Sequence, residues 1–151
     1  AIATRAYELR DKNPQEAEKL RQFLRQGFRK YPNTLTRVVY EPSGTDRIIH
    51  NYKTSDKYSL DGKVVGPDGW FNRIPDKDIL EKLLGIKNVS QINEFSQWIN
   101  ETDSYLCRLN SKPTQKEERV ARFGANGGGL VLGCVRDPLN ECPAFRVLRI
   151  D

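Results

Sequence analysis

Apolar side chains recur every three or four residues in the early part of the chain, which is the period of one face of an α-helix. The positions that follow this period are Leu20, Phe23, Leu24, Phe28 and Tyr31. Asn13 suits the N-cap and Pro14 the first helical position, whereas Pro32-Asn33 ends the pattern. The spacing therefore predicts an amphipathic helix that begins at Pro14 and ends before Pro32.

The apolar period then shortens to that of extended chain. Residues 35–40 and 47–52 are rich in β-branched and aromatic side chains and flank a turn-forming segment, so they predict two strands. A third short strand is expected at residues 58–60 or 63–65, with Asp61-Gly62 as a tight turn between these two segments. Trp70 and Phe71 follow another turn and are expected as core aromatics at a sheet edge.

The helical period returns in the middle of the chain. Pro75 and Asp76 open a short helix with Gly85 as its C-terminal stop. Ser90 is expected to cap a further helix whose apolar side runs on through the neighbourhood of Cys107, with residues 100–104 as a candidate interruption. Residues 112–122 are strongly charged and predict a loop or a short exposed helix.

Two apolar segments close the chain. Residues 130–136 follow a glycine run and predict a strand, and residues 144–150 are expected to return beside it as a terminal hairpin. Helices and strands are segregated along the chain, which favours an α+β fold over alternating βαβ units. We therefore predict a single compact domain, residues 1–151, in which an N-terminal amphipathic helix and two central helices pack on an antiparallel sheet of four to five strands.

Composition agrees with a folded domain. The chain has 151 residues, of which 37% are hydrophobic and 30% charged, and this length suffices for a hydrophobic core. No apolar run approaches the roughly 20 residues that a bilayer requires, so we predict a soluble protein without a transmembrane segment. The sequence holds no Met, even at position 1, which predicts a processed N-terminus. The composition does not indicate the compartment.

The three cysteines are an odd number, so at least one thiol has no partner within the chain. Cys134 and Cys142 flank a short segment. If that segment is a hairpin, their Cβ atoms can meet and form a disulfide; two unrelated reduced thiols are the alternative. His50 is the single histidine and no Cys-x-x-Cys occurs, so neither a metal site nor a cofactor is predicted.

Positive charge is the main functional indication. The net charge of +5 and the isoelectric point near 9.2 favour an anionic partner. Arg21, Arg25 and Arg29 recur every four residues on one side of the predicted helix, and Lys30 extends their charge. Together with Lys57 they are the candidate nucleic-acid-binding residues, because guanidinium and ammonium groups bind phosphates. The alternative is a solvated helix face.

His50 is the candidate catalytic residue if the domain cleaves RNA. A histidine that titrates near neutrality can transfer protons in metal-free RNA cleavage, with Lys53 stabilising the anionic transition state. A structural or exposed strand histidine is the alternative. The glycine run at residues 127–129 precedes a strand, which is not the order of a phosphate loop.

Three functions are therefore compatible with the sequence. The first is a basic interaction module that binds an anionic partner, chiefly RNA or DNA. The alternatives are a structural or linker subunit that contacts protein partners in a larger assembly, and a metal-independent, toxin-like RNA-cleaving domain. No motif decides whether the chain is an enzyme.

Overall fold

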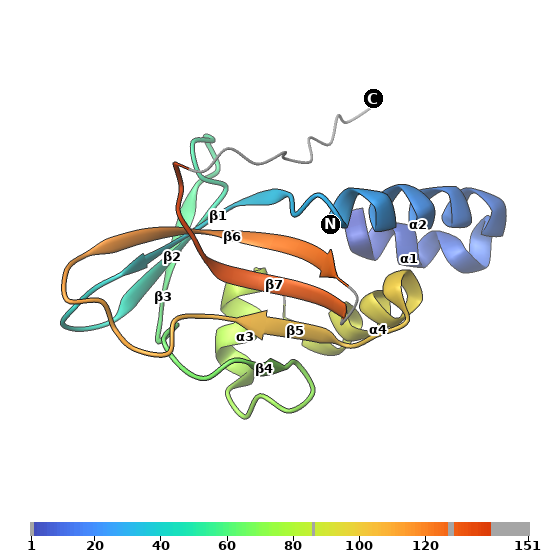
Figure 1. Ribbon diagram of the computed structural model, residues 1–151. Helices are drawn as coiled ribbons and strands as arrows, with labels where there is room; N and C mark the ends of the chain where they lie inside the picture. Colours follow the sequence, from blue (N-terminus) through green and yellow to red (C-terminus); the bar gives the residue numbers. More distant parts are fainter. Residues whose placement is uncertain (1, 86, 127–128, 140–151) are drawn as a thin grey trace.

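The computed structural model describes residues 2–85, 87–126 and 129–139 (Figure 1). In the described residues, two helices come first and are followed by two helices set among seven strands. In order, the elements are α1 (Ile2–Lys12), α2 (Pro14–Phe28), β1 (Asn33–Tyr40), β2 (Asp46–His50), β3 (Tyr58–Gly62), β4 (Gly69–Trp70), α3 (Lys77–Leu84), α4 (Val89–Asn100), β5 (Ser104–Cys107), β6 (Glu117–Asn126) and β7 (Gly129–Arg136).

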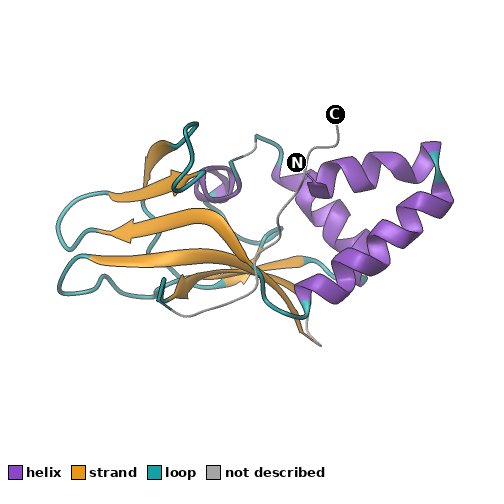
Figure 2. Ribbon diagram, turned by 90° about the horizontal axis from the view of Figure 1, so that it is seen from above, coloured by secondary structure: helices purple, strands orange, loops and turns teal. Residues whose placement is uncertain are grey.

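All seven strands form one sheet in the order β3-β2-β1-β6-β7-β5-β4. Neighbouring strands are antiparallel except β5 and β7, which run parallel. The sheet curls strongly into a half-barrel (Figures 1 and 2). The predicted α+β single domain is thus confirmed, but the sheet is mixed and larger than the antiparallel sheet of four to five strands that was predicted. The helix α1 is an additional element.

Local signals located α2 and α3 correctly. The Asn13 side chain accepts a hydrogen bond from the Glu16 amide at 3.2 Å at the start of α2. Asp76 caps α3 in the same way by accepting from the Ile79 amide at 3.3 Å, and Gly85 ends α3 with φ of 66°. Such caps use residues close together in sequence, so the sequence alone reveals them.

The prediction of a loop or exposed helix at residues 112–122 is confirmed for the loop at 112–116 but wrong for 117–122, because these residues belong to β6, which crosses the middle of the sheet. Its charges have partners at the surface: Glu118 lies 3.5 Å from the Arg37 guanidinium of β1, and Arg119 pairs with Glu117. The small apolar residues Val120 and Ala121 are buried. One ion pair across strands and one within β6 therefore let a charged segment occupy a central strand.

Three finer predictions also fail. Cys107 lies in β5 and not in a helix, because Glu101 adopts φ of 60° and ends α4. Asp61-Gly62 belongs to β3, where these residues pair with β2 and form no turn. Asn88, and not Ser90, is the N-cap of α4. The predicted strand at residues 144–150 lies outside the described residues.

The helices cover one face of the sheet. A first cluster of buried side chains joins that face to α3, and a second joins α2 and α4 to the ends of β6 and β7. The helices α1, α2 and α4 contact one another at one end of the sheet (Figure 2). None of the helices in the described part of the chain has both the length and the apolar character needed to cross a bilayer.

A buried carboxylate fastens the turn between β1 and β2. Asp46 is 0% exposed. Its oxygens accept hydrogen bonds from the amides of Glu41 at 3.1 Å and Val64 at 3.0 Å. They also lie 3.2 Å from the ammonium of Lys112, which donates in addition to the carbonyl oxygens of Glu41 and Gly44. Asp46 therefore joins three segments that are distant in sequence.

Candidate functional site

The candidate nucleic-acid-binding residues of the α2 region have two different environments. Arg21 donates to the Trp98 carbonyl at 2.6 Å and lies 3.2 Å from the Glu101 carboxylate, and Arg25 lies 4.0 Å from the same carboxylate. These two arginines therefore fasten α2 to the end of α4. Arg29 and Lys30 follow at the exposed end of α2, immediately before the chain enters β1.

Lys53 and Lys57 lie in the exposed loop between β2 and β3. Hydrogen bonds within the loop hold its shape. The side-chain amide of Asn51 donates to the Asp56 carboxylate at 2.9 Å, and the Thr54 hydroxyl donates to the backbone carbonyl of Asn51 at 2.8 Å. The Tyr52 amide donates to the Leu35 carbonyl at 2.9 Å. The loop is thereby placed beside β1, the same strand that Arg29 and Lys30 precede.

His50 is 6% exposed and lies on the helix-covered side of the sheet. Its Nε2 is 2.6 Å from the Lys82 carbonyl and its Nδ1 is 3.0 Å from the Thr36 hydroxyl. Because a carbonyl only accepts, Nε2 donates to Lys82, and Nδ1 shares a hydrogen bond with the Thr36 hydroxyl, which can donate or accept. Both ring nitrogens are thus engaged within the protein. The structure buries His50 and leaves Lys53 exposed, so it does not bring these two predicted residues to one surface.

The other face of the sheet carries two arginine–tyrosine pairs that the sequence did not single out. Val38 and Tyr40 are buried in the helix-facing core, so Arg37 points to the opposite, outward face. Its guanidinium lies over the Tyr52 ring, 4.8 Å from the centroid.

Arg122 of β6 forms the second pair. It is opposite Asn33 in the register of β1 and β6 and therefore shares the outward face. Its guanidinium lies over the Tyr31 ring, 5.1 Å from the centroid. Tyr31 packs on Gly124, where any Cβ would overlap the ring. A glycine at this position is thus needed to seat the tyrosine against the sheet.

We name the surface formed by Tyr31, Arg37, Tyr52 and Arg122 the arginine–tyrosine face. Leu35 lies between Tyr31 and Arg37 in sequence and is 55% exposed, whereas the Arg37 side chain is 17% exposed, so the surface is only partly open. Glu118 is the acidic side chain that contacts it, at 3.5 Å from Arg37. Arg29, Lys30 and Lys53 adjoin the two tyrosines in sequence. Cations therefore outnumber carboxylates along this surface.

The cysteines lie away from this surface. Cys134 in β7 is fully buried, and this burial raises the pKa of its thiol to about 12. Cys107 is half-buried; its pKa is also raised, first by burial and then by the charge of Asp68. Cys142 lies outside the described residues, so the predicted disulfide with Cys134 stays a prediction.

We expect native Cys134 to resist alkylation by N-ethylmaleimide at about pH 8, because only the thiolate reacts and the buried thiol stays protonated. Cys107 should react slowly, and both thiols should react in denaturant. Peptide mass mapping without reductant gives the result. Rapid labelling of native Cys134 would contradict its burial, and labelling of Cys134 and Cys142 only after reduction would establish the disulfide.

No group of three or more His, Cys, Asp or Glu side chains gathers as a metal site within the described ranges. Comparisons of the chain with protein-family models, with curated proteins and with solved structures found no match.

Proposed function

We propose that this domain binds single-stranded nucleic acid on the arginine–tyrosine face. The observation that carries the proposal is the pair of guanidinium groups, Arg37 and Arg122, each held over a tyrosine ring on the same outward face of the sheet. Guanidinium groups donate to phosphate oxygens, and their planes and aromatic rings stack on unpaired bases. Both parts of a nucleotide thus find a partner on this surface.

The stacked arrangement prepares the arginines for binding. A free arginine side chain carries about 2 kcal/mol of rotamer entropy, which binding would otherwise have to overcome. Here the Tyr52 ring and the Thr34 carbonyl, 3.3 Å from Nη1, already restrict Arg37. A preorganised donor loses less entropy when a phosphate arrives, so each contact contributes more to affinity.

The two pairs lie close together along the sheet. Arg37 is opposite Val120, two positions from Arg122 on β6, because the register of β1 shifts between Asn33 and Arg37, and two positions correspond to roughly 7 Å along a strand. One short stretch of a nucleic-acid strand can therefore contact both pairs. Leu35 offers an apolar contact, and the flanking lysines and Arg29 add attraction for the backbone.

A single strand fits this surface better than a duplex. Bases in a duplex are stacked on one another, and their edges are read by a helix or ribbon that enters a groove. The arginine–tyrosine face instead offers rings and guanidinium planes set against a sheet. Such platforms bind unpaired bases with little sequence preference.

Fluorescence anisotropy with labelled oligouridine and oligothymidine of about twelve nucleotides tests the proposal. We expect binding at low salt that weakens with added salt, with a slope of log K against log salt of about −0.7 per phosphate contact. Absence of binding at low salt would overturn the proposal and favour the assembly-subunit alternative. EDTA is present throughout, so cleavage of the RNA would instead support the RNA-cleaving alternative.

A further inference from the structure

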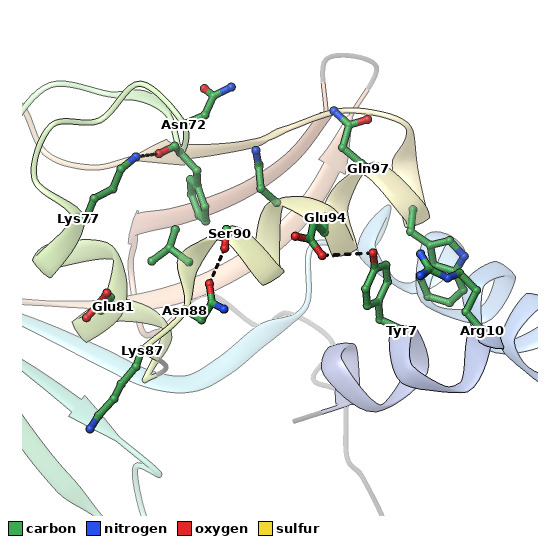
Figure 3. A pocket seen from close by; sticks show the side chains of 14 residues that line it. Tyr7, Arg10, Asn72, Lys77, Glu81, Lys87, Asn88, Ser90, Glu94 and Gln97 are labelled. Atoms are coloured by element: carbon green, nitrogen blue, oxygen red, sulfur yellow. Dashed lines mark hydrogen bonds between the residues drawn. The ribbon is translucent and has the colours of Figure 1, made fainter. Parts of the chain in front are cut away.

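A cavity of about 780 Å³ opens on the helix-covered side of the domain, away from the arginine–tyrosine face (Figure 3). Side chains from α1, α3, α4 and the segment after β4 line it. Its volume lies within the range of small-molecule sites. Phe71, which belongs to the hydrophobic core, and Val89 supply apolar lining.

Three side-chain amides form an ordered wall of this cavity. Asn72, Asn93 and Gln97 all donate to the carboxylate of Asp103, at 2.7, 2.9 and 2.9 Å. Asn93 also accepts from the Ser104 amide at 2.8 Å. Each primary amide has two N–H donors and one carbonyl acceptor. Asn72 and Gln97 thus keep an N–H and an oxygen for a ligand, while Asp103 fixes their orientation.

Aromatic rings stand beside this polar wall. The rings of Tyr7 and Trp98 meet edge to face, with centroids 6.1 Å apart. The Tyr7 hydroxyl donates to the Glu94 carboxylate at 3.3 Å, which joins α1 to α4 across the cavity (Figure 3). An apolar ring surface therefore adjoins carboxylate and amide groups within one cavity.

The charges around the cavity nearly balance. Lys77, Lys87 and Arg10 carry positive charge and Glu81 and Glu94 negative charge. Two of the cations already have partners, since Lys77 donates to the Phe71 carbonyl and Arg10 pairs with Asp11. A strongly charged ligand would meet like charge on one side or the other, which favours a neutral ligand.

We propose that this cavity binds a neutral, polyhydroxylated ligand of the mono- or disaccharide class. A hydroxyl group donates and accepts hydrogen bonds at once, as the amides of Asn72 and Gln97 do. The C–H faces of a pyranose ring are apolar and pack on aromatic rings such as Trp98. The proposal goes beyond nucleic-acid binding and does not depend on it, because the two surfaces share no residue.

Tryptophan fluorescence offers a direct test. The chain has two tryptophans, so Trp70→Phe leaves Trp98 as the sole reporter in the cavity wall. We expect a saturable change with at least one of glucose, galactose, mannose, N-acetylglucosamine and maltose. Asn72→Ala and Gln97→Ala in this background should weaken binding about tenfold, as loss of a ligand hydrogen bond does. The matched control is Gln91→Ala, an exposed side chain on the same helix.

Two results would overturn this proposal. One is the absence of a saturable change with every sugar of the panel; the other is saturation by AMP or by glutamate in place of a sugar. Should Trp70→Phe fail to fold, the side-chain amide resonances of Asn72 and Gln97 in the unmodified chain provide the readout. They must shift on sugar addition if the proposal holds and stay unchanged if it is wrong. Oligonucleotide binding is measured separately, so failure of either proposal is distinguishable from failure of the other.

Discussion

Replacing Asp46 with alanine is expected to lower the free energy of unfolding by about 3–5 kcal/mol. The carboxylate is 0% exposed and is joined to Lys112 and to the amides of Glu41 and Val64. Without it, the Val64 N–H loses its acceptor in the interior and the Lys112 ammonium loses its counter-charge. Both consequences are costly, because buried polar groups are stable only when paired.

Urea denaturation followed by tryptophan fluorescence measures this loss. Asp61→Ala is the matched control, since Asp61 lies in β3 next to β2 but is exposed. Its removal should change stability by no more than about 0.5 kcal/mol. If Asp46→Ala proved as mild as Asp61→Ala, Asp46 would not fasten the turn as described.

Replacing Arg37 and Arg122 together with alanine is expected to weaken oligonucleotide binding by about a hundredfold or more, because each hydrogen bond to a charged group contributes about 1.5–3 kcal/mol. The magnitude of the salt slope should fall by about 1.4, since two phosphate contacts are lost. Anisotropy titrations of the variant against salt concentration measure both quantities.

A charge-matched control distinguishes direct contacts of Arg37 and Arg122 with the oligonucleotide from the general attraction of a positively charged protein. Lys19→Ala combined with Arg73→Ala removes the same amount of positive charge at exposed positions outside the arginine–tyrosine face. This variant should bind nearly as the unchanged protein does. An equal loss in both double variants would mean that binding depends on net charge and not on the stacked arginines. Circular dichroism of each variant confirms that the fold is retained.

The helices α2 and α3 were predictable because their signals are local. Asn13, Asp76 and Gly85 each end or begin a helix through hydrogen bonds or backbone angles within a few residues. The central strand β6 was not predictable in this way. In the sequence, the charge of Glu118 suggests a loop. Its counter-charge in the sheet is Arg37 on the neighbouring strand, a residue far from it in sequence.

The residues of the candidate site also divide into those that the sequence identified and those whose partners are distant in sequence. Basic character and the exposed positions of Arg29, Lys30 and Lys57 were visible in the sequence. Arg21 was a candidate too, but its partner Glu101 comes from α4 and engages it in packing. Arg37 and Arg122 were missed because each meets its tyrosine only after the sheet has formed.

A signal for Arg37 was nevertheless present. Side chains alternate between the two faces of β1. Because Val38 and Tyr40 are buried, Leu35 and Arg37 lie on the outward face. An exposed leucine beside an arginine suits a binding surface. No comparable local signal exists for Arg122. Its proximity to Tyr31 depends on the register of β1 with β6 and on the absence of a side chain at Gly124.

An NMR titration of the ¹⁵N-labelled domain with oligouridine at low salt tests the proposed interface most directly. We expect the largest amide shifts at residues 31–37, 51–53 and 120–124, on the arginine–tyrosine face. Shifts centred instead on Arg21 and Arg25, or on the cavity beside Trp98, would contradict this expectation, as would a spectrum that the oligonucleotide leaves unchanged.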